Sequence, residues 1–258
     1  MVSHEDKEGA ILDALEEVIP SISFFHPTVT CITLKTVGGN LTAAITEDEK
    51  ISYVPVPSHI SHISTVPVTE LQKVVSLDAD VDRVKWKDQS FAFKKTEENF
   101  EETLRELTIL DRLRDSSYII DLKALVVNQD NSMRGFLMPY MRAGNLEVIF
   151  FNIRKDLRIP ESNDAPVFDW TLKITWAHQI TQGFVDLHAI AAYNGDLSTQ
   201  NVVLGPGGQA ILIDFNSSGF HPACTAPEAS ENYNDPNATR FTVPAGVYSL
   251  GVFLYALS

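Results

Sequence analysis

The feature that most constrains the fold of this chain is a pair of short apolar runs, residues 202–204 and 211–213, around the glycine- and proline-rich segment 205–208. Valine and isoleucine dominate both runs, and β-branched side chains favour strands. Two strands joined by such a turn predict an antiparallel hairpin. The hairpin must bring the residues just before its first strand against the residues just after its second strand.

Polar residues flank this hairpin at both ends. If Leu204 faces Ile211, the register of the ladder is set. Asn201 then faces Asp214, and opposed residues of an antiparallel ladder lie about 4.5 to 5.5 Å apart. An amide oxygen and a carboxylate at that separation suit a hard cation such as Mg²⁺, with water and phosphate as its remaining ligands. Asp196 lies five residues before Asn201, close enough to orient a hydroxyl nucleophile or to accept its proton.

The same segment resembles the catalytic loop and metal-binding strand pair of the eukaryotic protein kinases, whose pattern is H-R-D-L-x-x-x-N followed by D-F-G. Asp196, Leu197 and Asn201 match the first pattern in place, and Asp214 with Phe215 matches the start of the second. The 18 residues from Asp196 to Asp214 are a usual spacing for that family. The resemblance implies that Asp196 is catalytic and that Asn201 and Asp214 bind the metal.

Residues further upstream resemble the family's phosphate-binding strand and the helix after it. The run Phe-Ala-Phe-Lys at residues 91–94 resembles the V-A-I-K strand, which makes Lys94 the candidate phosphate-binding lysine. Lys95 points to the opposite face of that strand. In the family a glutamate of the next helix holds the lysine, and Glu106 fits that role, with Glu102 one turn earlier as the alternative.

A third group of residues resembles the adenine pocket. Residues 136–141, followed by Gly-Asn-Leu at 144–146, resemble the hinge between the two lobes, whose backbone near Pro139 and Met141 would read adenine. The resemblance implies ATP and Mg²⁺ as cofactors. Besides Lys94, the residues expected to bind the nucleotide are Ala92, Met138, Pro139, Met141 and Val203.

Two more matches complete the resemblance. Ala-Pro-Glu at residues 226–228 resembles the end of the activation segment, and residues 247–252 resemble the helix that anchors the large lobe. The matches follow the family's order over roughly residues 70–258. They imply an α+β, protein kinase-like bilobal fold, with a small antiparallel β lobe that holds one helix. The large lobe is expected to be mainly helical and incomplete at its C-terminal end.

The chain before this domain is expected to be an extension and a linker. Pro55, Pro57 and Pro67 interrupt all periodicity, which predicts a linker at residues 52–68. The predicted parts are an N-terminal extension and linker at residues 1–68 and a kinase-like domain at 69–258, with a small lobe at about 69–138 and a large lobe at about 142–258. Periodicity predicts helices at residues 5–18 and 97–113 and from an N-cap at Asp169 to 194–195, and strands at 28–34, 41–45, 81–86, 91–94, 124–128 and 135–138.

Several positions depart from the family pattern. No G-x-G-x-x-G segment lies between residues 71 and 86, so the amides that cover the phosphates lack their flexible glycines. Asn194 and Gly195 stand where the family has histidine and arginine, and Ser198 replaces a lysine that steadies the transferring phosphate. Gly246 stands where an aspartate braces the catalytic loop. These departures predict weaker ATP binding and slower chemistry.

The composition bears on which classes of partner the protein binds and in which cellular compartment it works. Thirty-four acidic and 20 basic side chains give a formal net charge of −14, so the surface should repel nucleic acid and anionic membranes. The first eight residues lack the basic and apolar segments of a secretion signal. We expect a cytoplasmic or nuclear protein whose partners are ATP, a protein substrate and a protein that covers the incomplete large lobe.

Three functions remain open. The leading one is ATP-dependent phosphoryl transfer to a serine or threonine hydroxyl of a protein. The second is a pseudokinase or scaffold without efficient turnover, which the missing glycines, Asn194 and Gly246 motivate. The third is a small-molecule phosphotransferase of the aminoglycoside or choline kinase type, against which the segment 226–228 argues.

Overall fold

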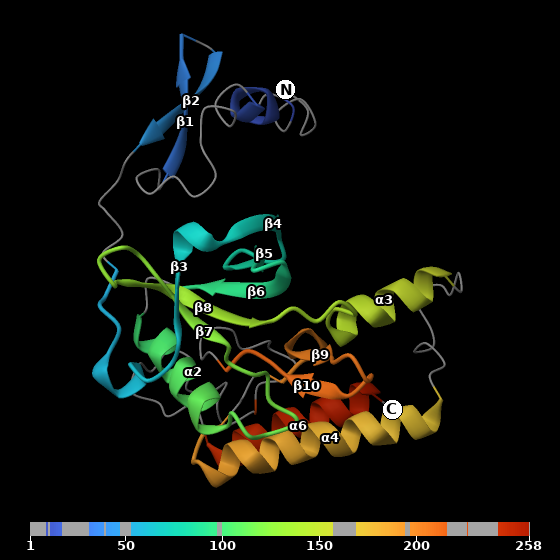
Figure 1. Cartoon of the computed structure of the whole chain (residues 1–258). Coiled ribbons are helices and arrows are strands. Elements are labelled where there is room, and N and C mark those ends of the chain that lie inside the picture. Colours follow the sequence, from blue (N-terminus) through green and yellow to red (C-terminus); the bar gives the residue numbers. More distant parts are fainter. Residues whose placement is uncertain are drawn as a thin grey trace. The chain divides into compact units, whose positions relative to one another are not determined.

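The structure is a computed structural model that describes residues 9, 11–16, 31–38, 40–46, 53–96, 100–156, 169–193, 197–215, 226 and 242–257. The chain divides into two compact units, Met1–Tyr53 and Val54–Ser258 (Figure 1). None of the helices among these residues is long and apolar enough to cross a bilayer.

The first unit holds a short helix and a β-hairpin. Residues 11–16 are helical, within the helix predicted at residues 5–18. Strands β1 (Cys31–Val37) and β2 (Asn40–Thr46) pair antiparallel, and Gly38 opens their turn with a φ of +58°. The predicted hairpin is therefore confirmed, with both strands extending beyond the predicted bounds.

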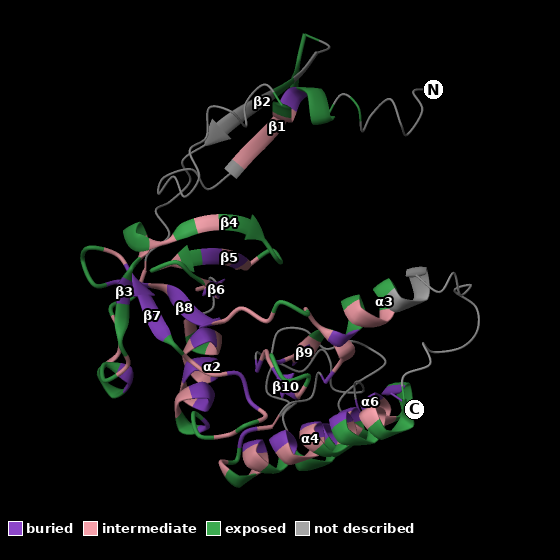
Figure 2. Ribbon diagram, turned by 45° about the vertical axis from the view of Figure 1, so that its right-hand side comes forward, coloured by how far each residue is buried: buried purple, intermediate pink, exposed green. Residues whose placement is uncertain are grey.

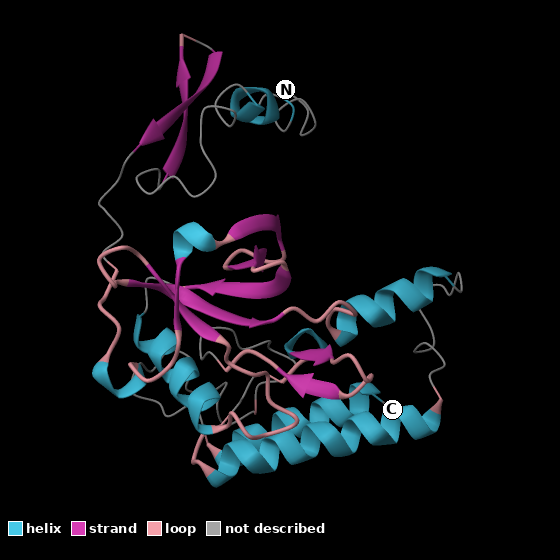
Figure 3. Cartoon of the chain, viewed as in Figure 1, coloured by secondary structure: helices cyan, strands magenta, loops and turns pink. Residues whose placement is uncertain are grey.

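The second unit begins with a six-stranded sheet in the order β3-β7-β8-β6-β5-β4, whose strands are labelled in Figure 1 and drawn in magenta in Figure 3. All neighbouring strands pair antiparallel except β3 and β7, which are parallel. The strands are β3 (Thr65–Pro67), β4 (Gln72–Ser76), β5 (Val81–Trp86), β6 (Gln89–Lys95), β7 (Ala124–Val127) and β8 (Met133–Pro139).

The central strands of this sheet are buried on both faces, as the purple segments of β7 and β8 show in Figure 2. Leu125 and Phe136 point into the main core, which also holds Leu107 and Leu110 of helix α2 (Phe100–Arg112). Alternate residues such as Leu137 point into a second, smaller core on the other face. The apolar stripe of α2 thus covers one face of the sheet, as its helical spacing predicts.

The predicted linker at residues 52–68 is wrong from residue 54 onward. This stretch forms the 3₁₀ turn η2 (Ser58–Ile60) and strand β3, and η3 (Val68–Glu70) follows. Ile60 is 1% exposed within the main core, and the Leu125 amide donates to the Ser64 carbonyl at 2.8 Å. The unit boundary after Tyr53 therefore lies earlier than the predicted boundary at residue 68.

Helices dominate the rest of the second unit. Among the described residues, the remaining elements are α3 (Leu146–Asp156), α4 (Trp170–Ala189), η4 (Thr199–Asn201), β9 (Val202–Leu204), β10 (Ala210–Leu212) and α6 (Val243–Leu257). The carboxylate of Asp169 caps α4 by accepting from the Thr171 amide at 3.0 Å, as predicted. However, α4 ends at Ala189 rather than at residues 194–195, and Ala191 then adopts a φ of +56°.

Helix α4 supports the hairpin of β9 and β10. The Trp176 indole donates to the Gly208 carbonyl at 2.9 Å, and the Gln179 side chain accepts from the Ala210 amide at 2.8 Å. A side chain at Gly183 would approach Leu212 to 2.8 Å, so the glycine permits this close packing. The predicted α+β architecture, a small β lobe with one helix followed by a mainly helical lobe, is confirmed.

Candidate active site

The candidate site centres on the amine of Lys94, at the end of β6. Its Nζ lies 2.9 Å from Oε2 and 3.1 Å from Oε1 of Glu106 in α2, and 2.9 Å from Oδ1 of Asp214, just after β10. Residues far apart in the sequence therefore meet around one cation. The contact expected between Lys94 and Glu106 is present, whereas their catalytic roles stay predictions.

The two carboxylates differ in their access to solvent. The side chain of Glu106 is 1% exposed and that of Asp214 is 42% exposed. Burial raises the pKa of Glu106 to about 7, against the opposing effect of the Lys94 charge. Burial would lower the pKa of Lys94, but the charges of Glu106 and Asp214 and the hydrogen bonds to both raise it overall. Glu106 is thus a fixed internal partner, and Asp214 is the carboxylate that can reach a ligand.

The neighbouring candidates Lys95 and Glu102 do not form the contact that joins Lys94 to Glu106. Lys95 donates from Nζ to the Ala79 carbonyl at 2.9 Å and lies 3.7 Å from Asp82, on the other side of the strand from Lys94. Oε2 of Glu102 is buried and has no hydrogen-bond partner among the residues that the structure describes. Lys94 and Glu106 are therefore the pair that the fold joins.

The expected register of the β9–β10 hairpin is wrong by one residue. Leu204 pairs with Ala210 rather than Ile211, and the Ile213 amide donates to the Asn201 carbonyl at 2.9 Å. The cause is the turn, in which the Gly205 amide donates to the Gln209 carbonyl at 2.9 Å and Gly208 takes a φ of +77°. This closure leaves three residues in the loop where the prediction required four.

Asp214 therefore follows the residue opposite Asn201 instead of facing Asn201 directly. Its φ of +61° lies in the left-handed region, which costs a non-glycine residue about 1 kcal/mol or more. Among the described residues no group of three His, Cys, Asp or Glu side chains is arranged to hold a metal ion. The donors fit Mg²⁺ only as an amide oxygen and a carboxylate that share the ion with water and phosphate.

The residues expected to bind the nucleotide lie on adjoining segments. Ala92 pairs with Met138 across β6 and β8, and Val203 of β9 bridges to Asn145 in the segment after β8. Met138 and Val203 are buried, and Ala92 packs against the same core. Pro139, the last residue of β8, pairs with Phe91, and Met141 also packs against that core. These residues lie on strands and on the segment that follows β8, and their role in nucleotide binding stays a prediction.

Two predicted segments lie partly or wholly outside the described residues. Asp196 belongs to residues 194–196, so its placement is not described, although Leu197 beside it is fully buried. Within 226–228, only Ala226 is described, and it is buried. The roles assigned to both segments stay predictions.

Residues 77–80 form the turn between β4 and β5, within the stretch 71–86 that lacks a G-x-G-x-x-G segment. The amides of residues 77 and 78 donate to the Val81 carbonyl at 2.8 and 3.0 Å, and the Lys95 amide donates to the Asp80 carbonyl at 2.8 Å. Asp78 accepts from the amide of residue 79 at 2.7 Å. This turn is therefore closed by hydrogen bonds and carries two carboxylates beside the strand end that holds Lys94.

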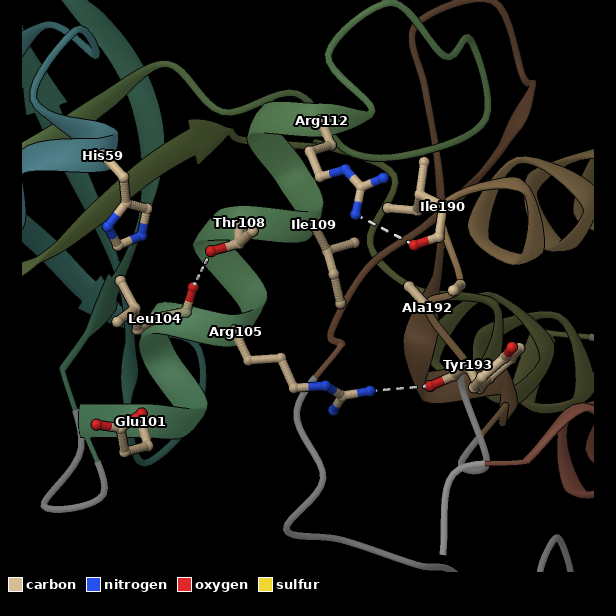
Figure 4. A pocket seen from close by; sticks show the side chains of 11 residues that line it. His59, Glu101, Leu104, Arg105, Thr108, Ile109, Arg112, Ile190, Ala192 and Tyr193 are labelled. Atoms are coloured by element: carbon tan, nitrogen blue, oxygen red, sulfur yellow. Dashed lines mark hydrogen bonds between the residues drawn. The ribbon is translucent and has the colours of Figure 1, made fainter. Parts of the chain in front are cut away.

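A pocket of about 540 Å³ lies against a different face of α2 from Glu106 (Figure 4). Arg105 and Arg112 line it from the helix, His59 from η2, and residues 190–193 from the segment after α4. Arg112 donates to the Ile190 carbonyl at 3.1 Å.

Comparison with known proteins gives one family and several relatives. The profile of the family described as "Protein kinase domain" matches residues 79–258. A probable leucine-rich repeat receptor-like protein kinase of Arabidopsis thaliana is 27% identical over 157 residues, which cover 58% of this chain and 22% of the relative. An inactive leucine-rich repeat receptor-like serine/threonine-protein kinase of the same plant is 27% identical over 165 residues, 61% of this chain and 24% of the relative.

A MAP kinase kinase of Saccharomyces cerevisiae is also 27% identical, over 154 residues that cover 57% of this chain and 28% of the relative. The matched part of the chain therefore spans between 22% and 28% of the length of these relatives.

Proposed function

Because the chain belongs to the protein kinase domain family, we propose that it is an ATP-dependent protein kinase that phosphorylates serine or threonine hydroxyls. The observation that carries this proposal is the contact of one buried lysine amine with two carboxylates that differ in exposure, Glu106 and Asp214. That arrangement offers a fixed cation for phosphate oxygens and an accessible carboxylate for a metal.

Lys94 would bind the α- and β-phosphates of ATP. Its amine is almost fully buried, and its charge is stabilised by two carboxylates at 2.9 Å. Glu106 has no access to solvent, so it keeps its position when a phosphate oxygen approaches Lys94. Asp214 is more exposed and can exchange its contact with Lys94 for one with a metal ion.

Asp214 and Asn201 would hold Mg²⁺ through a carboxylate and an amide oxygen. When bound, Mg²⁺ supplies positive charge that offsets the phosphate oxygens during transfer. Asp196 would orient the acceptor hydroxyl and accept its proton. Transfer moves the γ-phosphoryl group of ATP to the acceptor oxygen, and ADP departs as the leaving group. The proton of the acceptor hydroxyl passes to the Asp196 carboxylate.

A transfer assay with radiolabelled ATP and a mixed protein substrate tests the proposal. We expect Asp196→Ala to lower incorporation at least a hundredfold, in line with the usual contribution of a positioned acid or base. Asp115→Ala is the matched control, because Asp115 is an exposed aspartate at the end of the α2 region. Equal incorporation by the wild type and Asp196→Ala would remove the proposed activity.

The closed β4–β5 turn favours a second candidate, a nucleotide-binding or scaffold protein with little turnover. Its carboxylates at residues 78 and 80 would face phosphate groups with like charge, and its hydrogen bonds restrict adjustment. One relative is itself described as inactive. Thermal unfolding with Mg²⁺ and ATP separates the candidates in part, because ATP at about a hundred times its dissociation constant adds about 2.7 kcal/mol of stability. A shift without transfer supports the second candidate.

The class of acceptor needs its own comparison. The family match favours a protein acceptor over the small alcohols used by aminoglycoside or choline kinases. Parallel assays with serine and threonine peptides and with small alcohols decide between them. Transfer to the alcohols alone would overturn the protein-kinase assignment while keeping the roles of Lys94 and Asp214.

A further inference from the structure

Two neighbouring residues of helix α2 form hydrogen bonds with the backbone of Phe215. The Arg105 guanidinium donates from Nη1 to the Phe215 carbonyl at 3.2 Å, and Oε1 of Glu106 accepts from the Phe215 amide at 3.4 Å. Arg105 and Glu106 are neighbours in the helix, so any movement of α2 disturbs both bonds together. The peptide that follows Asp214 is thus held by the same helix that holds Lys94.

Arg105 also reaches a second segment. Its Nη2 donates to the Tyr193 carbonyl at 3.1 Å, as the dashed line in Figure 4 shows. Tyr193 directly precedes residues 194–196, which include Asp196. A planar guanidinium can donate to two acceptors at once without changing its orientation, which a lysine amine does less well. One side chain therefore joins α2 to the Phe215 backbone, directly after Asp214, and to the Tyr193 backbone, three residues before Asp196 in the sequence.

The contacts around Asp214 and Phe215 explain how Asp214 keeps its backbone conformation. A left-handed φ in an aspartate persists only when the surrounding contacts hold it. Here Lys94 binds the Asp214 side chain, and Arg105 and Glu106 bind the next peptide. Each of these two bonds has a charged partner, the Arg105 guanidinium as donor and the Glu106 carboxylate as acceptor, and the Arg105 bond is the shorter of the two.

We propose that Arg105 is a positioning residue that sets the backbone of Asp214 and Phe215 and ties α2 to the segment leading into Asp196. The inference rests on the proposed function for the roles of Asp196 and Asp214. It goes beyond that function because Arg105 contacts neither nucleotide nor acceptor in the assignment above.

Hydrogen exchange of the full chain tests the proposal independently of activity. In Arg105→Met we expect the Phe215 amide to exchange on the order of tenfold faster, with the amides of β7 unchanged. Arg105→Lys should fall between this variant and the wild type, and it also serves if the methionine variant does not fold. Arg112→Met is the matched control, since Arg112 lies on the same face and binds only the Ile190 carbonyl among the hydrogen bonds above. Unchanged exchange at Phe215 in both Arg105 variants would overturn the proposal.

Kinetics supply the second readout. In Arg105→Met, kcat should fall at least tenfold while KM for ATP changes by less than about threefold, with partial recovery in Arg105→Lys. A fall in Arg112→Met equal to that in Arg105→Met would count against a specific role. If the wild type transfers no phosphate, the proposed function fails, and the exchange result still decides whether Arg105 holds this backbone.

Discussion

Replacing Gly135 by alanine should damage both the sheet and the site. Gly135 pairs with Lys95 across β8 and β6, at a φ of +144° that residues with a side chain rarely adopt. An added Cβ would lie 2.0 Å from the Lys94 carbonyl oxygen and 2.8 Å from Cε2 of Phe93. The oxygen belongs to the main chain and cannot rotate away, so the strands must separate by about 1 Å.

The expected loss follows from these contacts. A strained φ costs about 1 to 3 kcal/mol, and each weakened ladder hydrogen bond costs about 1 kcal/mol. Gly135→Ala should therefore lower the free energy of unfolding by about 3 to 5 kcal/mol, a large share of the 5 to 15 kcal/mol that is typical of a domain. The shift also moves Lys94 from its carboxylate partners, so ATP affinity should fall on the order of tenfold.

Urea unfolding followed by the fluorescence of the buried Trp176 measures the first effect, and calorimetric titration with ATP measures the second. Gly251→Ala in α6 is the matched control, because no described atom outside the backbone of its own helix lies within 4 Å of the added Cβ. The control should gain about 0.5 to 1 kcal/mol, since alanine favours the helix over glycine. A Gly135→Ala variant as stable as the wild type would refute the reasoning.

Three further predictions concern single groups. The pKa of Glu106 is raised to about 7 in the folded protein, against an ordinary 4.5. Its contribution to the free energy of unfolding is therefore fully present below pH 4.5 and is lost as the pH rises through 7. Urea titrations from about pH 4.5 to 8 should show the wild type losing about 3 kcal/mol relative to Glu106→Gln, and parallel curves would contradict this. Ala191→Gly should raise thermal stability by about 1 kcal/mol by relieving its left-handed φ, so an unchanged melting temperature would be a failure. Asp169→Ala should cost about 1 kcal/mol in urea by removing the cap on the Thr171 amide, with Asp169→Asn close to the wild type.

The sequence predicts those parts of the candidate site that depend on local sequence patterns. The Lys94–Glu106 pair was predicted from the resemblance to the family's strand and helix, and strand alternation separated Lys94 from Lys95. Helical spacing alone could not choose between Glu106 and Glu102, which lie one turn apart. The β9–β10 hairpin was predictable because β-branched runs flank a glycine-rich turn. Its register was not, because a hydrogen bond between Gly205 and Gln209 decides how many residues the turn takes.

Tertiary contacts account for what the sequence could not predict. Pro67 and its neighbours look like a linker, yet β3 gains its stability by pairing with β7 from far along the chain. Arg105 gives no local signal either, because its acceptors are main-chain carbonyls 88 and 110 residues away. In the sequence, Arg105 stands out only as the residue directly before the predicted Glu106.

We propose that Lys94, Asn201 and Asp214 form one site for ATP and its metal ion. Calorimetric titration of ATP with and without Mg²⁺, in the wild type and in Asp214→Asn, tests this most directly. Mg²⁺ should strengthen ATP binding to the wild type at least tenfold, and Asp214→Asn should bind ATP equally with and without the ion. A wild type that binds no ATP, or a variant that keeps the full effect of Mg²⁺, would contradict it.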